Sequence, residues 1–367
     1  MRRGISVLIR GGRVAYLGPD GGAPDPSGAE IVDASGATII PGLVDCHAHF
    51  TGLGGANWIA RFGDPEADLL ARGAEAARDL ARMGILTARD VGAPRRLNLR
   101  IRDTHRGRVD APTIIAAGTW LARRDKFPPF VVFVDSGDEL RQAAIAEMDA
   151  GADFVKIAVD TGRTGEEVTF TIDELVPTVA AVHERGKRIT AHAQGRGAAV
   201  AVQAGVDSIE HGFGVDAATA DRMAGHTTLV PTLSVLESFV GFAATDGGRF
   251  AESKNASAAL LEQALGVVRA AKRAGVRIAT GSDFGGGSVR PGHLAWEVEM
   301  LVRAGLEPYE ALASATWVGG ELLAIKDAGT IHEGSPGDVV LVHGDPLSDP
   351  AVLWRVWRVY HGGERVG

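Results

Sequence analysis

Most of the chain alternates between short apolar segments and longer segments in which apolar residues recur at helical spacing. The apolar segments have the length of buried strands, and the longer ones have the pattern of amphipathic helices. Two of the longer segments, EAARDLARMG and DELRQAAIAEMDAG, end at a glycine in the position that commonly follows a last helical turn. This alternation of strands and helices predicts a parallel sheet covered by helices.

Eight strand–helix units of this kind, over roughly 250–280 residues, match the usual length of a (β/α)8 TIM barrel. An open doubly wound sheet is the alternative, but it would normally carry a glycine-rich phosphate turn after its first strand, and none is present. We therefore predict a barrel. Its strands are expected at IIPGLVDCH, ILTARDVG, PTIIAAG, DFVKIAVD, RITAHAQ, VDSIEHG, TLVPTL and RIATGSD.

The two ends of the chain have a different pattern. The segment ISVLIRGGRVAYLG predicts two short strands around a Gly11-Gly12 turn, and a further strand is expected near Glu30–Val32. At the other end, GDVVLVHGD and WRVWRVYHG also have the length and pattern of strands. We predict one small β-sandwich built from both ends, residues 1–40 plus 328–367, beside a catalytic barrel domain at 41–327.

Composition narrows the classes of partner. A net charge of −8 without a block of like charges disfavours nucleic acid, and no run approaches the ~18 apolar residues of a membrane span. Cys46 is the only cysteine, which excludes an intramolecular disulfide and a thiolate zinc cage. We expect a cytoplasmic protein acting on a small molecule. Alanine-rich outer helices and the apolar WRVWRV segment also favour a homo-oligomer.

Polar residues fall at the carboxyl ends of the predicted strands, where barrels carry their catalytic groups. On the first strand, His47 and His49 point the same way because side chains alternate, so both imidazoles can chelate one ion. The alternative is two ordinary polar residues at the start of a loop. Three further strands end with His192, His211 and Asp283, and such residues at several strand ends indicate a metal site.

Lys156 lies within the apolar run of the fourth strand. Burial of an uncompensated ammonium lowers its pKa, so the amine becomes neutral and nucleophilic. A neutral amine can react with CO2 to give a carbamate, an anionic ligand able to bridge two cations. The alternative is that Lys156 forms an ion pair with Asp153 or Asp160.

The sequences of these segments resemble those of the amidohydrolase superfamily, in its binuclear form with a carboxylated lysine. Within it, the chain is most similar to the imidazolonepropionase-like and metal-dependent dipeptidase (prolidase-like) branch. The resemblance covers nearly the whole chain. The resembling stretches are IIPGLVDCHAHF, MGILTARDVG, GADFVKIAVD, RITAHAQG, AGVDSIEHGF, LVPTLS, RIATGSDFG and EGSPGDVVLVHGDPL.

The resemblance implies that His47, His49 and Asp283 bind one divalent cation and that His192 and His211 bind a second. Carboxylated Lys156 would bridge the two. Imidazole and carboxylate ligands suit Zn²⁺, with Mn²⁺, Co²⁺ or Ni²⁺ as alternatives. The expected reaction is hydrolysis of an amide or peptide C–N bond by a hydroxide that bridges the metals, with Asp283 as general base and then acid.

Two acidic residues beside strand ends, Asp90 and Glu210, are candidates for orienting the ligand histidines. Structural salt bridges are the alternative role for both. The chain departs from prolidase-like relatives after the third strand, where a Gly-Gly-His element is usual and GTWLARRDKFPPF stands instead.

The loops after the first and third strands supply the candidate substrate contacts, which are Trp58, Arg61, Arg123 and Arg124. Cationic groups at the rim favour a small substrate that bears a carboxylate. A cyclic amide such as a lactam or imidazolone is the alternative substrate. The presence of Lys156 and the absence of a His-x-x-Glu after the fifth strand disfavour a deaminase. The complete set of candidate ligands disfavours a scaffold without activity.

Overall fold

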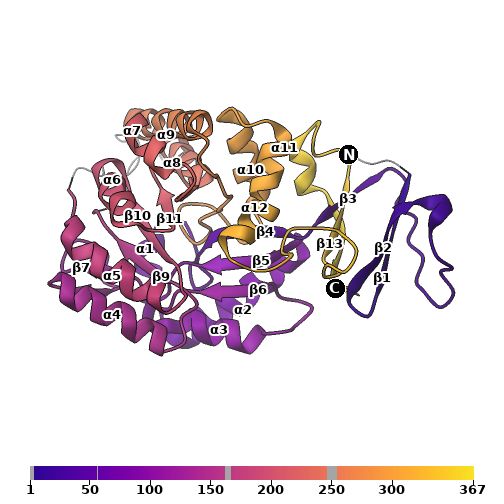
Figure 1. Cartoon of the computed structure of the whole chain (residues 1–367), viewed down its shortest axis with the longest axis horizontal. Coiled ribbons are helices and arrows are strands. Elements are labelled where there is room, and N and C mark those ends of the chain that lie inside the picture. Colours follow the sequence, from indigo (N-terminus) through magenta and orange to yellow (C-terminus); the bar gives the residue numbers. More distant parts are fainter. Residues whose placement is uncertain (1–3, 56, 162–166, 246–253) are drawn as a thin grey trace.

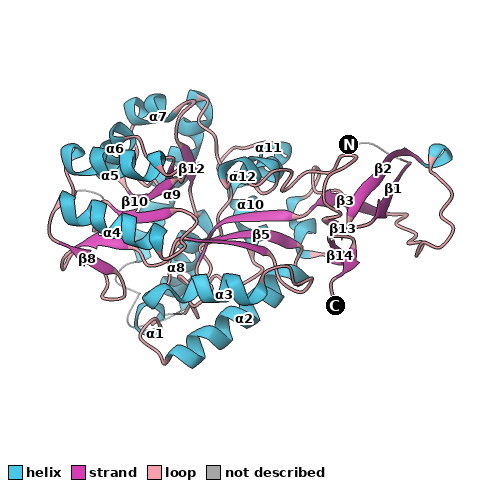
Figure 2. Cartoon of the chain, turned by 60° about the horizontal axis from the view of Figure 1, so that its bottom comes forward, coloured by secondary structure: helices cyan, strands magenta, loops and turns pink. Residues whose placement is uncertain are grey.

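A computed structural model of the chain describes residues 4–55, 57–161, 167–245 and 254–367. Helices surround a set of parallel strands, and a smaller β-module that contains both chain ends lies beside them (Figures 1 and 2). The parallel strands form two hydrogen-bonded sets, β4-β5-β6 and β12-β11-β10-β9-β7-β8. Their bounds are β4 Leu43–Ala48, β5 Ile85–Asp90, β6 Thr113–Ala116, β7 Leu121–Arg123, β8 Val132–Val134, β9 Val155–Ala158, β10 Ile189–Ala193, β11 Ser208–His211 and β12 Thr228–Val230.

The segment 277–283, predicted as the eighth strand, joins the two sets. Its Ala279 amide donates to the Leu229 carbonyl on β12 at 2.9 Å, and its Thr280 carbonyl accepts from the Cys46 amide on β4 at 2.9 Å. At the opposite seam, the Asp153 amide donates to the Ala116 carbonyl at 2.9 Å. These bonds continue the strand order around the ring, so the predicted (β/α)8 architecture is confirmed.

The helices pack around the strands through small and aliphatic residues. On α2, Gly73 is needed because a Cβ at this position would lie 2.2 Å from Ile101 of α3. A capping box between Thr171 and Glu174 begins α5. The helices are α1 Trp58–Arg61, α2 Glu66–Arg82, α3 Leu97–His105, α4 Gly137–Asp149, α5 Ile172–Glu184, α6 Gly195–Ala204, α7 Ala217–Met223, α8 Leu233–Thr245, α9 Lys254–Ala274, α10 Leu294–Arg303, α11 Pro308–Ser314 and α12 Trp317–Leu322.

The two ends of the chain build the small β-module together, as predicted. The hairpin of β1 and β2 turns at Gly11 and Gly12, which both have positive φ. A four-stranded sheet follows the order β15-β14-β13-β3, so a strand from the N-terminal end pairs antiparallel with β13. The bounds are β1 Ile5–Arg10, β2 Arg13–Pro19, β3 Ala37–Pro41, β13 Val339–His343, β14 Val356–His361 and β15 Glu364–Arg365.

Two details of the strand prediction are wrong. Residues 30–32 are not a strand, because the third strand of this module lies at Ala37–Pro41. The predicted first barrel strand also began too early, since Ile39, Ile40 and Pro41 belong to β3 and the chain passes through Gly42 before β4 begins. The boundaries given above for the two predicted domains stay a prediction.

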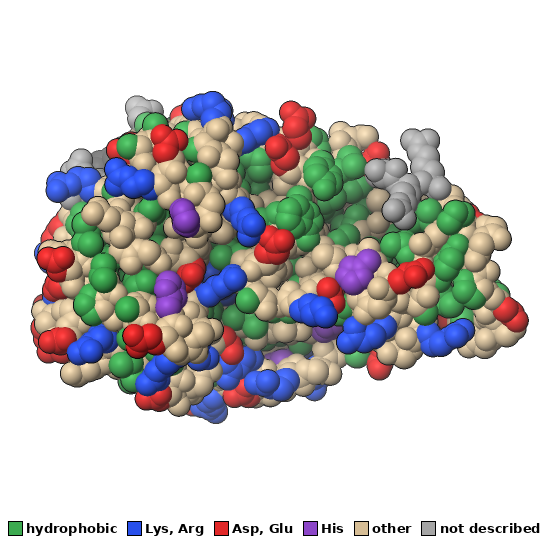
Figure 3. All heavy atoms as spheres, viewed as in Figure 1, with side chains coloured by type: hydrophobic (Ala, Val, Ile, Leu, Met, Phe, Trp, Pro, Cys, Tyr) green, Lys and Arg blue, Asp and Glu red, His purple; other side chains and the backbone are tan. Residues whose placement is uncertain are grey.

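The surface carries charges of both signs. In the face shown in Figure 3, acidic and basic side chains alternate over the barrel and no large area of one sign is visible. Within the described ranges, no helix combines the length and the apolar composition that crossing a bilayer requires.

Candidate metal centre

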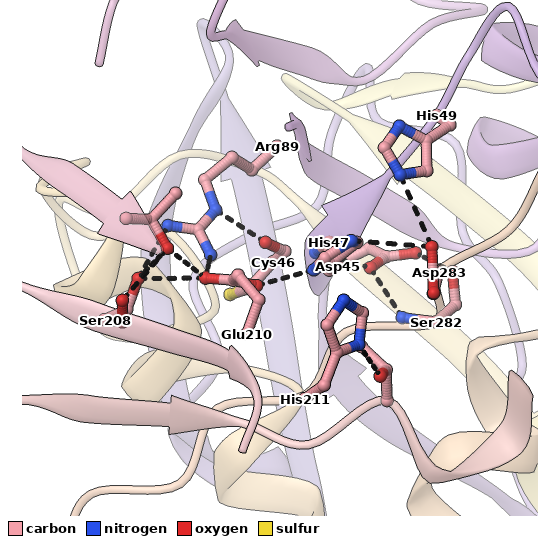
Figure 4. Close-up of polar contacts among 12 residues, drawn as sticks. Asp45, Cys46, His47, His49, Arg89, Ser208, Glu210, His211, Ser282 and Asp283 are labelled. Carbon is pink, nitrogen blue, oxygen red and sulfur yellow. Dashed lines mark hydrogen bonds and ion pairs between the residues drawn. The ribbon is translucent and has the colours of Figure 1, made fainter. Parts of the chain in front are cut away.

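His47, His49 and Asp283 meet at the carboxyl end of the barrel. His47 lies on β4, His49 directly follows that strand, and Asp283 lies at the end of the neighbouring eighth strand. Asp283 Oδ1 lies 3.4 Å from Nε2 of His47 and 3.4 Å from Nε2 of His49 (Figure 4). All three residues are buried, and one ligand atom from each lies within 4.8 Å of the others. This geometry suits a single divalent cation.

The far nitrogen of each of these imidazoles is held by an acceptor. His47 Nδ1 lies 2.6 Å from Glu210 Oε2, and His49 Nδ1 lies 3.1 Å from the Gly92 carbonyl. An acceptor at Nδ1 fixes the tautomer that leaves Nε2 unprotonated and able to bind a metal. Both rings are therefore arranged as ligands before any ion binds.

His192 and His211 lie beside this group. Their ring centroids are 4.5 Å apart, and the His211 centroid is 5.0 Å from that of His47. His211 Nδ1 is 2.7 Å from Thr232 Oγ1, which again leaves Nε2 toward the centre. Lys156 reaches the same region from β9, which pairs in parallel with the strand of His192.

Two buried polar atoms in this region have no hydrogen-bond partner among the described residues, Lys156 Nζ and His192 Nε2. Lys156 Nζ makes no hydrogen bond to Asp153, which pairs with Arg102 at 2.7 Å, and none to Asp160. Leaving a buried donor or acceptor unpaired is costly, so native structures do so rarely. Both atoms, and the neutral imidazoles around them, fit the ligand set of a metal pair.

Burial sets the protonation states that metal binding requires. It lowers the pKa of His47 to about 4 and that of His192 to about 3, and it holds the pKa of His211 well below its usual value. Burial also lowers the pKa of Lys156 to about 8. Burial alone would raise the pKa of Asp283, but His47, His49 and Lys156 reverse this and hold it below its usual value. At neutral pH the site thus offers neutral imidazoles on His47, His192 and His211 and an ionised Asp283.

The backbone is left-handed at three residues of the centre. The φ angles are +70° at His211, +49° at Thr232 and +52° at Asp283. This conformation is rare in residues other than glycine and persists where surrounding contacts impose it, commonly at functional sites. At each of these residues the left-handed conformation lets the chain turn sharply at the end of a strand.

The predicted orienting residues differ in their contacts. Glu210 bonds directly to His47, whereas Asp90 accepts from the backbone amides of Phe50 and Gly92, at 3.0 and 2.9 Å. Asp90 therefore holds the backbone at Phe50, which follows His49, and at Gly92, whose carbonyl lies against the His49 ring. It makes no hydrogen bond with the ring itself. A residue that the sequence analysis missed is Asp45, which shares the face of His47 by strand alternation and accepts from the Ser282 amide at 3.0 Å and its hydroxyl at 2.5 Å.

Aromatic rings line the centre on two sides. The Trp120 ring centroid lies 4.7 Å from that of His49, and the Phe127 centroid lies 5.3 Å from that of His192. Phe62 packs against His49 at 5.9 Å and against Trp58 at 6.1 Å. Trp58, a predicted substrate contact, therefore belongs to this aromatic wall as its outer member, whereas the sequence analysis did not single out Trp120.

The arginines expected to bind a substrate carboxylate already have acidic partners. The ion pairs are Arg61–Asp64 at 2.8 Å, Arg123–Glu174 at 2.5 Å and Arg124–Asp135 at 2.8 Å. Arg123 also donates to the Thr169 carbonyl and lies over the Phe170 ring. These contacts hold the three side chains in the protein framework, so a carboxylate-bearing substrate would have to compete with an internal carboxylate for each of them.

Comparisons with known proteins agree with this architecture. The model of the Amidohydrolase family matches residues 38–366. An uncharacterised protein of Mycobacterium tuberculosis is 33% identical over 333 residues, 89% of this chain and 84% of its own length. The imidazolonepropionase of Deinococcus deserti is 25% identical, with 94% and 87% covered.

A solved structure described as a Xaa-Pro dipeptidase with bound methionine superposes with a TM-score of 0.86. Its sequence is 27% identical, and the superposition covers 98% of this chain and 94% of that one. The sequence motifs indicated the imidazolonepropionase-like and prolidase-like branch, and these similarities confirm it. The chain belongs to the amidohydrolase family and is a hydrolase that acts on carbon–nitrogen bonds.

Proposed function

We propose that this protein hydrolyses an amide or peptide bond in a small molecule with the help of two divalent cations, of which zinc suits the ligands best. The observation that carries the proposal is the pair of buried atoms on Lys156 and His192 that have no hydrogen-bond partner among the described residues, beside the His47–His49–Asp283 cluster. We assign the first cation to that cluster and the second to His192 and His211. A carboxylated Lys156 would bind both, since an anionic bridge balances two neighbouring positive charges.

When bound, the cations would lower the pKa of water and polarise the substrate carbonyl. The protein supplies the proton transfers. Asp283 is ionised at neutral pH and lies at the mouth of the cluster, with 12% of its side chain exposed. It can accept the proton of the attacking water and then donate it to the leaving nitrogen, which is otherwise a poor leaving group.

The aromatic wall indicates the kind of group that the substrate presents. Trp120 and Phe127 contact the two histidines assigned to different cations, so a scissile amide placed between them would have rings on both sides. Such walls favour a planar or apolar body. That the substrate also bears a carboxylate is a more specific prediction than an amide with an apolar body. Its proposed partners, Arg61, Arg123 and Arg124, are those with internal ion pairs.

A cyclic amide is the second candidate substrate, and the similarity to an imidazolonepropionase favours it. Both candidates need the same attack on a carbonyl carbon. They differ in the product, because a ring opens into one molecule whereas a linear amide separates into an acid and an amine.

Metal analysis and a substrate panel test the proposal together. We expect about two divalent ions per chain and turnover of at least some linear amides, dipeptides, N-acyl amino acids or lactams that carry an apolar group. Mass spectrometry of the products separates ring opening from release of an amine. A protein with one ion and an unmodified Lys156 would contradict the binuclear assignment, and deamination of an exocyclic amine would contradict amide hydrolysis.

The pH dependence of Lys156 carboxylation gives a second test. Only the neutral amine reacts with CO2. Burial is the largest cause that lowers the pKa of Lys156, Glu210, Asp283 and Asp160 oppose it and Arg89 adds to it, and together they place the pKa at about 8. At fixed dissolved CO2, the rate of Co²⁺ uptake by metal-free protein should rise about tenfold from pH 6 to 7 and level off above pH 8. A rate that keeps rising steeply toward pH 10, as for an ordinary lysine, would contradict this environment.

A further inference from the structure

Arg89 lies across the interior of the barrel directly beneath the metal centre. It extends from β5, is 4% exposed and reaches toward β4 and β11 (Figure 4). Its guanidinium donates three hydrogen bonds to three neighbouring groups. Nε donates to the Cys46 carbonyl at 2.5 Å, Nη2 to Glu210 Oε1 at 2.6 Å and Nη1 to Ser208 Oγ at 3.3 Å.

Glu210 connects Arg89 to the centre. The two oxygens of its fully buried carboxylate have different partners. Oε1 accepts from Arg89, from Thr190 Oγ1 and from Ser208 Oγ, whereas Oε2 lies 2.6 Å from His47 Nδ1. Without the guanidinium, the carboxylate would lose the charged donor that holds Oε1 and so orients Oε2 toward His47.

We propose that Arg89 is a positioning residue of the metal centre, holding His47 through Glu210 on the ring side and through the Cys46 carbonyl on the backbone side. The planar guanidinium makes both contacts at once, which a lysine ammonium with a single nitrogen at this depth does not reproduce. Outer partners of metal ligands typically change metal affinity about 10–100-fold when they are mutated. Arg89 is one residue further from the centre than Glu210, but it hydrogen-bonds to groups on both sides of His47, namely Glu210 and the Cys46 carbonyl.

A purely structural ion pair is the competing explanation, and it predicts a different result. Buried ion pairs are weak determinants of stability, and well-packed apolar replacements of both partners are often tolerated. Such a pair would alter the melting temperature of the metal-free protein without a specific change at the ligand site. Metal affinity and the absorption spectrum of bound Co²⁺ therefore distinguish the two roles.

The proposal rests on the metal centre described under Proposed function, and the experiment begins with metal binding by the wild-type protein. If the wild type binds no divalent ion, the proposed function fails. If it does, Arg89→Met should bind Co²⁺ about 10–100-fold more weakly in competition with a chromophoric chelator, with a changed absorption spectrum. Arg89→Lys should regain part of this affinity, because it keeps the charge beside Glu210.

Arg96→Met is the matched control. Arg96 pairs with another buried carboxylate, Glu147, at 2.9 and 3.0 Å, away from the metal ligands. This variant should lower the melting temperature of the metal-free protein and leave Co²⁺ affinity and spectrum unchanged. Wild-type Co²⁺ affinity in folded Arg89→Met, or an equal loss in Arg96→Met, would overturn the proposal.

A small cavity beside Arg89 permits a rescue experiment. It has a volume of about 140 Å³ and is lined by Arg89, Thr190 and Ser208 among others. Arg89→Ala would enlarge it, and millimolar guanidinium should then restore part of the lost Co²⁺ affinity, whereas urea at the same concentration should not. Equal effects of the two compounds would overturn the proposal. If neither Arg89→Met nor Arg89→Ala folds, Arg89→Lys tests the proposal. Wild-type Co²⁺ affinity and spectrum in that variant would contradict a role for the planar guanidinium.

Discussion

Asp283→Asn is expected to keep much of its bound metal and to lose roughly 10²–10⁴-fold in turnover, the usual range for general acid–base catalysis. The asparagine oxygen can still approach the cation between His47 and His49, but the amide cannot accept a proton at neutral pH. In the wild type those two histidines and Lys156 hold the pKa of Asp283 below its usual value against the effect of burial. The carboxylate is thus ready to act as a base in the resting enzyme.

Turnover of the best substrate from the panel and metal content, measured on the same preparation, provide the test. Asp216→Asn is a suitable control, because its carboxylate caps α7 by accepting from the Thr219 amide at 2.7 Å and lies outside the metal centre. Asparagine caps helices as well as aspartate does, so the Asp216→Asn variant should keep both its fold and its turnover. Near-normal turnover in Asp283→Asn would remove Asp283 from the proton transfers, and loss of metal in parallel with activity would reduce its role to that of a ligand.

Lys156→Ala should lose more than about 100-fold in metal affinity together with its activity, since even outer partners of ligands contribute about 10–100-fold. In the proposed centre this substitution removes the anion that would balance the charges of two neighbouring cations. Short carboxylates such as acetate or propionate should restore part of both properties, because they fit the space of the missing carbamate and carry its charge.

The matched control for this variant is Lys187→Ala. Lys187 precedes β10 at the opposite end of the barrel, and its amine donates to the Ala152 carbonyl at 2.7 Å. Metal content should be unchanged there. Two ions per chain in Lys156→Ala, or a rescue equally effective with neutral amides, would show that the centre does not depend on an anionic bridge.

Strand periodicity was sufficient to predict which side chains gather at the candidate metal centre. His47 and His49 share a face because they are two residues apart, and the parallel order brings the ends of β4, β9, β10 and β11 to one side. The strand boundaries were harder to predict. The apolar run at Ile39 and Ile40 continues almost directly into β4, and only its pairing with β13 assigns it to another sheet.

The partners of charged side chains could not be predicted from local sequence. Arg123 looked available to a substrate because its partner Glu174 lies 51 residues further along the chain. Arg89 escaped notice for the same reason, since its contacts with Cys46 and Glu210 depend on strands that meet only in the closed barrel. Pairings over such separations are set by tertiary geometry, which neither alternation nor composition encodes.

The pairing of β3 with β13 has a consequence for how the protein is made. Ile40 lies opposite Val340, a residue that leaves the ribosome 300 positions later. Until then β3 lacks its strand partner, and β4 lacks the neighbour that residues 280–283 provide until those residues are made. Contacts so distant in sequence slow folding and leave apolar strands exposed to aggregation during synthesis. The nascent chain therefore carries two strands without these partners for most of its translation. A stop before residue 280 leaves both β3 and β4 without them, and a stop between 284 and 338 leaves β3 alone without its partner.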